Sequence, residues 1–428
     1  IAFVLETKLK GTDMSYLNEV NLERDYVMRT FGRSPVEFVE GKGMLLYDDE
    51  GREYLDFLSG IGVTSLGHCP PRLVSAVADQ AAKLMHVSNY FYIEKRGEVA
   101  RILSDLLNDK VDPSELMPWK TFFANSGAEA NECAIKLARL FARKRAEQLG
   151  RDVSDAPRLI VTLEKSFHGR TLATLSATAQ PAKQEAFQPL PGGFAATPAN
   201  DVSALEELFE RRGGEICAVM VECVQGESGV HPCTQEFLAA ARKLTSATGA
   251  LLICDEVQCG VFRTGEPFGF QNFGVIPDIV TMAKGIASGF PMGACAARSE
   301  VAAAFSPGDH GSTFGGSNLA MAAAYATLTT LVEEGFGEKV KKTGAYLREK
   351  LASLDAVVEV RGLGLMVGLD LDASWGDAHD AVASGLEAGL VFNATGPSTL
   401  RFLPPLICDE GDVDRFVDAL AAILANPR

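Results

Sequence analysis

The fold is decided by an apolar run that ends in two acids, Leu251-Leu252-Ile253-Cys254-Asp255-Glu256-Val257-Gln258. A run of this kind is typical of a parallel sheet whose two faces are both covered. A second run, Pro277-Asp278-Ile279-Val280-Thr281-Met282-Ala283, delivers Lys284 and then Gly285. Ligands of such sheets bind beyond the carboxyl ends of the strands. The two runs therefore place Asp255 and Lys284 where a ligand is expected.

Short apolar runs alternate with helical patterns on both sides of this pair. The expected strands are Thr121–Ala124, Leu159–Leu163, Ala218–Val224, Leu251–Val257 and Ile279–Met282. Apolar residues between the first two recur at helical spacing on one face, namely Ala130, Cys133, Ala134, Leu137, Ala138 and Phe141. This alternation predicts an α/β domain whose largely parallel central sheet is covered by helices on both faces.

The pattern changes near Ala320, which indicates a second domain. The elements expected there are helices over Asn318–Glu333 and Lys339–Leu354 and strands around Val357–Val360 and Leu365–Leu371. Turn signals near the N-terminus separate short strands at Gly41-Lys42-Gly43 and Asp48-Asp49-Glu50-Gly51. We expect a large domain over residues 63–320 and a smaller α+β domain over 321–428. Residues 1–62 are expected to form an arm that packs with the smaller domain.

Composition narrows the classes of partner. The chain of 428 residues has 40 basic and 56 acidic residues and a formal net charge of −16, which repels nucleic acid and anionic membranes. No apolar run reaches the roughly 18 to 20 residues that span a bilayer. The first stretch lacks the leader and cleavage site of a signal peptide. Met14 is a candidate translation start, which would leave residues 1–13 outside the natural protein.

Cysteine and histidine usage points to a reducing compartment and away from metal. The nine cysteines are scattered without a C-x-x-C pair, so we expect a cytoplasmic protein without structural disulfides. No cluster of histidines suggests a metal site, and none is expected. Neither His168 nor His310 suggests an acid–base role.

Lys284 and Asp255 suggest a specific chemistry. A lysine that follows a buried strand and has small neighbours is poorly solvated, which lowers its pKa and makes it a competent Schiff-base nucleophile. A carboxylate at a strand end is suited to holding a pyridinium nitrogen protonated. A buried salt bridge between two parallel strands would explain the same two residues.

A small-residue turn before a helix offers an anion site. The segment Phe123-Ala124-Asn125-Ser126-Gly127-Ala128-Glu129-Ala130-Asn131-Glu132 is predicted to be a strand, a turn and a helix start. Backbone N–H groups at the helix N-terminus, with Ser126 as N-cap, form a phosphate cup. Plain helix capping explains Ser126 but leaves the run of small residues unexplained.

Blocks along nearly the whole chain resemble the class III (ornithine/acetylornithine-type) aminotransferases of pyridoxal-phosphate (PLP) fold type I. The matching blocks are Tyr54–Ile61, Leu66–Cys69, Asn125–Ala130, Phe167–Thr171, Val221-Glu222, Gln225–Glu227, Asp255–Gln258, Ala283–Gly285, Gly311–Gly316 and Leu400–Pro405. So many matching blocks in the same order are not a coincidence. The resemblance implies a large domain with a mostly parallel sheet and a smaller α+β domain built from the N- and C-terminal parts.

The resemblance also implies PLP as cofactor. Lys284 would bind it covalently and later move a proton between substrate and cofactor, while Asp255 would pair with the pyridine nitrogen. Phe167 would stack on the ring face, although an ordinary core aromatic is the alternative. The further cofactor contacts expected are Ser126, Gly127 and Ala128 at the phosphate, Val257 against the ring, Gln258 at the phenolic oxygen, Glu256, and Thr313. Thr313 would reach the phosphate across a subunit interface, which would make a homodimer with shared active sites obligatory.

Two arginines are expected to bind substrate. Bidentate guanidinium–carboxylate pairing suits 2-oxoglutarate, the common acceptor, and the family implies this role for Arg170 and Arg401. By the same resemblance, Glu227 would pair with Arg401 while an ω-amino donor binds. Arg170 would hold the α-carboxylate of the donor, assisted by Ser312. A structural ion pair is the alternative for each arginine.

Phe31 favours an acetylated donor. Relatives often carry a tyrosine at this position, and its hydroxyl helps to hold the free α-ammonium group of ornithine. A phenyl ring leaves that ammonium group without a partner, whereas an N-acetylated amine needs none. The expected reaction is therefore the ping-pong transfer of the δ-amino group of N2-acetylornithine to 2-oxoglutarate. Other donors, namely ornithine, succinylornithine, 4-aminobutyrate and acetyl-lysine-type amines, stay open, as do a semialdehyde aminomutase and a non-catalytic PLP-fold protein.

Overall fold

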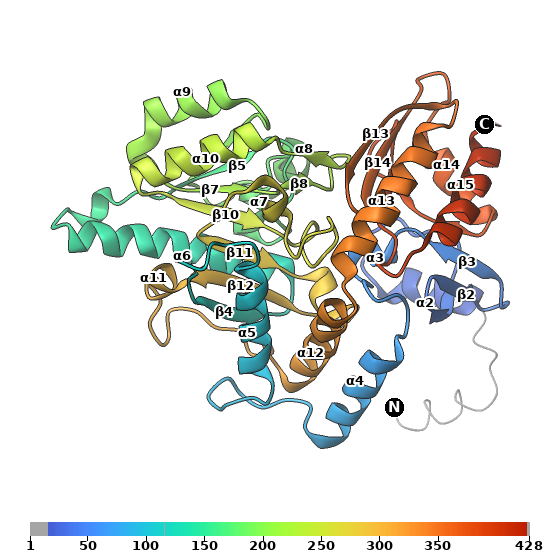
Figure 1. Cartoon of the computed structure of the whole chain (residues 1–428), viewed down its shortest axis with the longest axis horizontal. Helices are drawn as coiled ribbons and strands as arrows, with labels where there is room; N and C mark the ends of the chain where they lie inside the picture. The colour runs from blue at the N-terminus through green and yellow to red at the C-terminus, as the bar shows by residue number, and fades with distance from the viewer. Residues whose placement is uncertain (1–15, 115, 426–428) are drawn as a thin grey trace.

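The computed structural model describes residues 16–114 and 116–425, and a seven-stranded sheet lies at its centre (Figure 1). The candidate start at Met14 lies outside the described residues. The strands, in spatial order, are β4 (Trp119–Ala124), β12 (Gly293–Arg298), β11 (Ile279–Met282), β10 (Leu251–Asp255), β7 (Ile216–Val221), β5 (Leu159–Leu163) and β6 (Phe194–Thr197). β12 is antiparallel to both of its neighbours, and the other pairs are parallel. The expected mostly parallel sheet is confirmed.

Helices cover both faces of this sheet. Successive residues of β10 alternate between two apolar clusters: Ile253 packs in the cluster of α6 (Gly127–Gln148), and Leu252 packs in the cluster of α10 (Gln235–Thr248). Such alternation is the period-2 geometry of a strand buried on both sides. The other helices around this sheet are α4 (Pro71–Lys83), α5 (Arg96–Leu107), α7 (Leu172–Ala177), α8 (Pro181–Gln184), α9 (Val202–Arg212), α11 (Ser299–Ala302) and α12 (Asn318–Glu333).

Two expected strands end earlier than the sequence indicates. β10 ends at Asp255 because the Val257 N–H turns back to donate to Asp255 Oδ1 at 3.0 Å. β7 ends at Val221, and β8 (Val224–Gln225) instead pairs with β9 (His231–Pro232). The short 3-10 helices are η1 (Val153–Asp155), η2 (Glu185–Phe187), η3 (Gly213–Glu215), η4 (Gly269–Phe273) and η5 (Lys284–Ala287).

The C-terminal part builds a second, four-stranded sheet of order β13-β14-β17-β16. Its elements are β13 (Val357–Leu363), β14 (Met366–Leu371), β16 (Asn393–Ala394), β17 (Thr399–Phe402), α13 (Phe336–Ala352), α14 (Ala378–Glu387) and α15 (Glu410–Leu424). The N-terminal elements are α2 (Tyr16–Tyr26), β1 (Phe38–Lys42), β2 (Leu45–Asp48), β3 (Glu53–Asp56) and α3 (Ser59–Gly62). β3 pairs in parallel with β15 (Leu390–Val391), so the two ends of the chain share one sheet.

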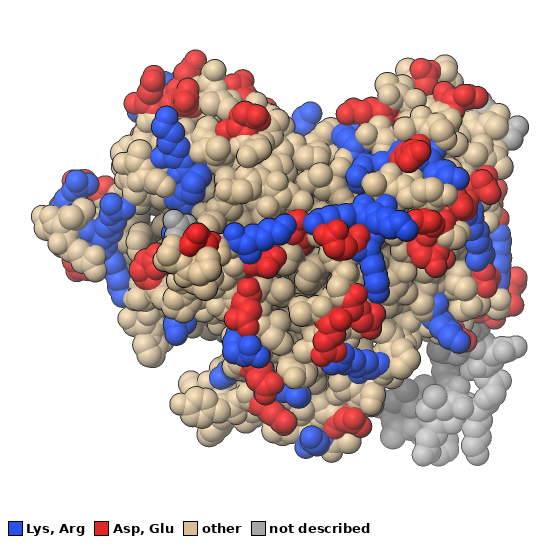
Figure 2. Space-filling model, in the orientation of Figure 1, with Lys and Arg blue, Asp and Glu red and all other residues tan. Residues whose placement is uncertain are grey.

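Acidic and basic side chains are interspersed on the face that Figure 2 shows. None of the helices in the described ranges has the length and apolar content that a bilayer crossing requires. Over the same ranges, no three His, Cys, Asp or Glu side chains come together closely enough to hold a metal ion.

Candidate active site

A cavity of about 500 Å³ lies at the carboxyl ends of β10 and β11. Its lining residues are Val63, Asn125, Ser126, Gly127, Ala128, Asn131, Phe167, His168, Gly169, Arg170, Glu222, Asp255, Val257, Gln258, Ala283, Lys284, Gly289, Phe290, Pro291 and Met292. Three segments that are far apart in sequence, around residues 127, 168 and 255, therefore meet at the carboxyl ends of the strands. These ends are where parallel sheets bind ligands.

Lys284 begins η5 directly after β11 and lies deep among protein atoms, yet it stays reachable from the cavity. This enclosure lowers the pKa of its ammonium group, although the nearby carboxylate of Glu227 opposes the shift. The backbone of Lys284 has a φ of 49°, which is a strained left-handed conformation for a residue other than glycine. An amine with a lowered pKa at a cavity wall is suited to nucleophilic attack on a carbonyl.

Asp255 is buried and held by three hydrogen bonds. Its Oδ2 accepts from Asn131 Nδ2 at 2.8 Å and from His168 Nδ1 at 2.7 Å, and its Oδ1 accepts from the Val257 N–H. Burial disfavours a charged His168, but the hydrogen bond and charge of Asp255 outweigh it and raise the pKa of the imidazole. His168 therefore fixes the orientation of Asp255, a role that the sequence did not suggest.

The start of α6 forms the expected helix cap at the cavity. Ser126 Oγ accepts the Glu129 N–H at 3.2 Å, which confirms Ser126 as N-cap. The N–H groups at the start of a helix have no acceptor within that helix, and the helix dipole makes them attract anions. A side chain at Gly127 would place its Cβ 2.8 Å from Val257 Cγ1, so only glycine lets α6 pack this closely against the end of β10.

These groups fit PLP. The N-terminus of α6 offers a phosphate site, Asp255 offers a carboxylate for a ring nitrogen, and Lys284 offers an amine for an aldehyde. Phe167 and Val257 line the same cavity and supply apolar contacts for a planar ring.

Arg401 and Glu227 form the expected pair. Arg401 lies on β17 with only 1% of its side chain exposed, and its Nη1 donates to Glu227 Oε1 at 2.7 Å. Gln258 joins them, because its Nε2 donates to Glu227 at 3.1 Å and its Oε1 accepts from Arg401 at 3.2 Å. Burial disfavours the Glu227 carboxylate, but Arg401 outweighs it and lowers the pKa of Glu227 to about 2. The guanidinium group is thereby neutralised.

Arg170 lies at the mouth of the same cavity. Its side chain is exposed, and its Cζ lies 5.6 Å from the ring centroid of Phe167. Arg170 is thus open in the cavity lining, whereas Arg401 is masked by Glu227 and reaches that lining through its contact with Gln258.

Glu256 does not reach the cavity, which corrects the expected cofactor contact. Its Oε2 accepts the Gly269 N–H at 2.7 Å and its Oε1 accepts the Phe270 N–H at 2.9 Å, so it anchors η4 inside the protein. The reason is strand geometry: Asp255 faces the cavity, so its neighbour points to the opposite side.

Ser312, Thr313 and Phe31 do not line the cavity of the single chain. Ser312 Oγ accepts from Asn125 Nδ2 at 3.0 Å rather than supporting Arg170, and Thr313 is exposed beside it. Phe31 is 78% exposed and lines a groove made by the N-terminal segment of residues 16–38. Within one chain, the structure thus does not bring Thr313 or Phe31 to the cavity lining, whereas Ser312 contacts that lining through Asn125.

Glu222 is a buried carboxyl group of the cavity for which the sequence suggested no role. It follows β7, and its Oε1 accepts the Phe167 N–H at 2.8 Å. Burial raises its pKa to about 7. The expected strand Ala218–Val224 runs through Glu222, whereas β7 ends one residue before it, so the position of Glu222 at a strand end was hidden.

Comparisons with known proteins identify the family of the chain. The family model described as Aminotransferase class-III matches residues 27–424. The acetylornithine aminotransferase of Caldanaerobacter subterraneus subsp. tengcongensis is 44% identical over 413 residues, which cover 96% of this chain and 100% of that protein. The acetylornithine aminotransferase of Methanocaldococcus jannaschii is 44% identical over 417 residues, covering 96% and 99%.

Solved structures show the same fold. The ornithine aminotransferase of Toxoplasma gondii ME49 has a TM-score of 0.88 at 30% identity and covers 99% of this chain and 97% of its own. The acetylornithine aminotransferase of Elizabethkingia anophelis has a TM-score of 0.81 at 31% identity, covering 96% and 99%. The chain belongs to the class III aminotransferases, which are PLP-dependent enzymes.

Proposed function

We propose that this aminotransferase transfers the δ-amino group of N2-acetylornithine to 2-oxoglutarate, giving N-acetylglutamate 5-semialdehyde and glutamate in arginine biosynthesis. The masking of Arg401 by Glu227 next to Gln258 of the cavity lining, together with the open Arg170 of that lining, carries the proposal. Such a pair accepts a donor with one carboxylate when Arg401 is masked and a dicarboxylate acceptor when Arg401 is free. The relatives named acetylornithine aminotransferases support the acetylated donor.

The residues of the chain divide the work of the cofactor site. PLP, when bound, supplies an electron sink for negative charge at the substrate carbon. The N–H groups of Gly127 and Ala128 at the start of α6 would hold the phosphate group. Asp255, oriented by His168, would hold a proton on the pyridine nitrogen. Lys284 Nζ would hold the cofactor, and as a free amine it would move a proton to and from the substrate carbon.

The arginines read the substrates in turn. In the donor half-reaction Arg170 binds the α-carboxylate, and Glu227 keeps Arg401 neutralised. In the acceptor half-reaction Glu227 moves aside, and Arg401 binds a carboxylate of 2-oxoglutarate as a bidentate pair. The low pKa of Glu227 keeps it charged throughout the physiological range, so its movement, rather than its protonation, opens the gate.

Ornithine is the second candidate donor, because the solved structure with TM-score 0.88 is an ornithine aminotransferase. Steady-state formation of glutamate from 2-oxoglutarate separates the two. We expect kcat/KM for N2-acetylornithine to exceed that for ornithine by about tenfold or more. A higher kcat/KM for ornithine would instead identify the protein as an ornithine aminotransferase.

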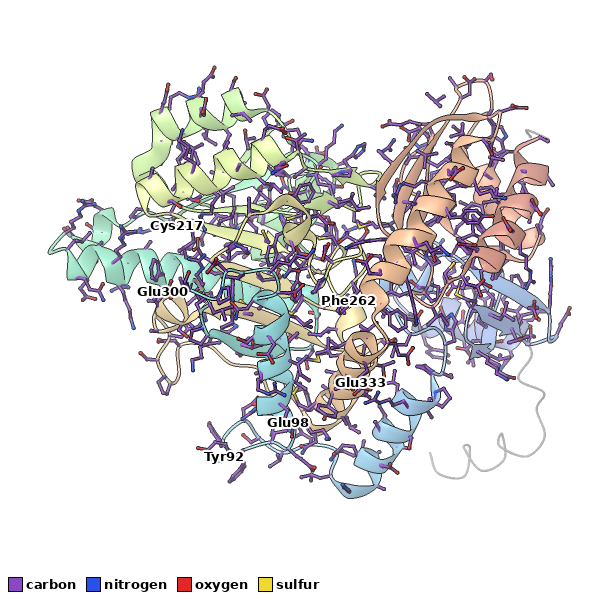
Figure 3. The ribbon with its side chains drawn as sticks, in the orientation of Figure 1. Tyr92, Glu98, Cys217, Phe262, Glu300 and Glu333 are labelled. Atoms are coloured by element: carbon purple, nitrogen blue, oxygen red, sulfur yellow. The ribbon has the colours of Figure 1, made fainter. Side chains whose placement is uncertain are left out.

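We further propose that a second copy of the chain completes the site. The loop that carries Leu84, Met85, Phe91 and Tyr92 leaves these apolar side chains exposed, and Figure 3 shows Tyr92 on this loop. Asn89 of this loop donates to the carbonyls of Ser312 and Gly315 at 2.8 and 3.1 Å, so the loop adjoins the segment that contains Thr313. A contiguous exposed apolar surface marks a protein interface. Thr313 would then reach the phosphate site of the other subunit.

Sedimentation, which reports the mass of the particle in solution, tests the proposed dimer. The wild type is expected to sediment at twice the chain mass of 45.7 kDa. Phe314, next to Thr313, is 62% exposed, and its ring lies 5.1 Å from that of His86 on the apolar loop. A Tyr92→Glu, Phe314→Glu double variant should sediment as a monomer and lose most of its activity, because a charge buried in an apolar interface is unfavourable. Val358→Glu is the matched control, since Val358 is 67% exposed on β13. A double variant that stays dimeric and active would contradict the proposed surface.

Cytoplasmic location is part of the proposal. All nine cysteines are free, and eight of them are buried. Extracellular compartments favour disulfides, whereas the cytosol keeps thiols reduced. Unpaired thiols in this number are therefore consistent with a cytoplasmic enzyme.

A further inference from the structure

A lysine outside all of these roles lies beside the cavity. Lys183 belongs to α8, is half-buried, and holds its Nζ 5.4 Å from the ring centroid of Phe167. Arg170 Cζ lies 5.6 Å from the centroid of the same ring. Two cations therefore lie against one aromatic ring that lines the cavity; the ring attracts each of them, whereas the two cations repel each other.

The protein holds Lys183 in this position. Its Nζ donates to Gln180 Oε1, and Gln180 Nε2 donates to the carbonyl of Ser166 at 2.9 Å, directly before Phe167. Gln184, the last residue of α8, anchors the turn because its Nε2 donates to the Thr178 carbonyl at 2.7 Å. The ammonium group is thus fixed toward the ring instead of ranging through solvent.

The nearby carboxylates do not neutralise this ammonium group by direct pairing. Glu227 is bound to Arg401, and Glu222 accepts a backbone N–H from Phe167. Burial lowers the pKa of Lys183, with Glu227 opposing the shift. Lys183 and Arg170 thus place two positive charges around Phe167, a residue of the cavity lining.

We infer that Lys183 selects donors whose α-nitrogen is acylated over donors with a free α-ammonium group. The inference rests on the proposed role of Arg170 in binding the donor α-carboxylate. That role places the α-nitrogen on the carbon next to the carboxylate, at the part of the cavity where Arg170 and Lys183 both lie against Phe167. A positive α-ammonium group is repelled there, whereas an amide nitrogen is neutral. The attraction of Lys183 for the α-carboxylate is common to both donors and cancels in their ratio.

Two substitutions at one position test this charge. Lys183→Met keeps the length of the side chain and removes the charge, and Lys183→Arg keeps the charge. Lys339→Met is the matched control, because Lys339 Nζ lies 5.0 Å from the ring centroid of Phe336, away from the cavity. For each variant, kcat/KM is measured with N2-acetylornithine and with ornithine.

The ratio of kcat/KM for N2-acetylornithine to that for ornithine is expected to fall about tenfold in Lys183→Met. It should stay within about twofold of the wild type in Lys183→Arg and Lys339→Met. An unchanged ratio in Lys183→Met, or an equal fall in Lys339→Met, would overturn the inference. The donor preference of the wild type tests the proposed function separately: a higher kcat/KM for ornithine would contradict the proposed donor. The change of the kcat/KM ratio in Lys183→Met would still test the role of Lys183.

Discussion

Replacing Lys284 with alanine is expected to lower turnover by about 10⁴-fold or more, because the variant loses both its nucleophile and its proton carrier. The phosphate site at the start of α6 and Asp255 remain, so the variant should still bind PLP. Its absorbance should be that of the free aldehyde form, since no amine is present at position 284. Stopped-assay turnover and the spectrum of the reconstituted variant check both expectations.

Folding must be separated from chemistry in this variant. Burying the ammonium group is unfavourable, as its lowered pKa shows. The free energy of unfolding of the cofactor-free Lys284→Ala variant should therefore match or exceed that of the cofactor-free wild type. Turnover within about tenfold of the wild type would refute the assignment of Lys284.

Arg401→Ala is expected to slow the acceptor half-reaction by about 10²- to 10³-fold and the donor half-reaction by less than about tenfold. The reason is that Arg401 is neutralised by Glu227 while the donor binds and is needed only when the second carboxylate arrives. Single-turnover measurements of each half-reaction, with donor alone and with 2-oxoglutarate alone, give the two rates directly.

Arg242→Ala provides the control for a lost ion pair. Arg242 Nη1 lies 2.8 Å from Asp278 Oδ2, and this half-buried pair is not part of the cavity lining. Its loss should lower stability and leave the balance of the two half-reactions unchanged. Equal losses in both half-reactions of Arg401→Ala would contradict the gate formed with Glu227.

The parts of the site that the sequence predicted are those encoded by local pattern. The apolar runs before Asp255 and Lys284 each predict a strand and its carboxyl end, and parallel pairing brings the two ends together. Ser126 predicts the start of α6 because an N-cap side chain acts within three residues. The Arg401–Glu227 pair spans far more of the chain, and the family resemblance rather than any local pattern predicted it.

Other contacts depend on the completed fold. Asp255 is 87 positions from His168 and 124 positions from Asn131 in the sequence. No local pattern could therefore show that both residues bind its carboxylate. Glu256 was misassigned because it stands between two cavity residues in sequence. Because successive side chains of a strand point to opposite faces, the cavity-facing Asp255 predicts that the side chain of Glu256 points away from the cavity.

The expected roles of Ser312, Thr313 and Phe31 depend on the proposed contact between two subunits, which the pattern of one sequence does not show. Thr313 and Ser312 lie on an exposed segment beside the apolar loop of Tyr92, and Phe31 lies on an exposed N-terminal segment. Their roles stay predictions, as do the domain limits at residues 62 and 320. The strand pairing of β3 with β15 shows only that the N-terminal and C-terminal parts share a sheet.

The central claim is that the chain takes the δ-amino group from an N-acetylated donor. The most direct measurement follows the absorbance of cofactor bound to Lys284 in a single turnover, without keto acid, as N2-acetylornithine, ornithine or 4-aminobutyrate is added. Our account predicts rapid conversion to the pyridoxamine form by N2-acetylornithine, at concentrations about tenfold or more below those of the other donors. Conversion chiefly by ornithine or 4-aminobutyrate would contradict it.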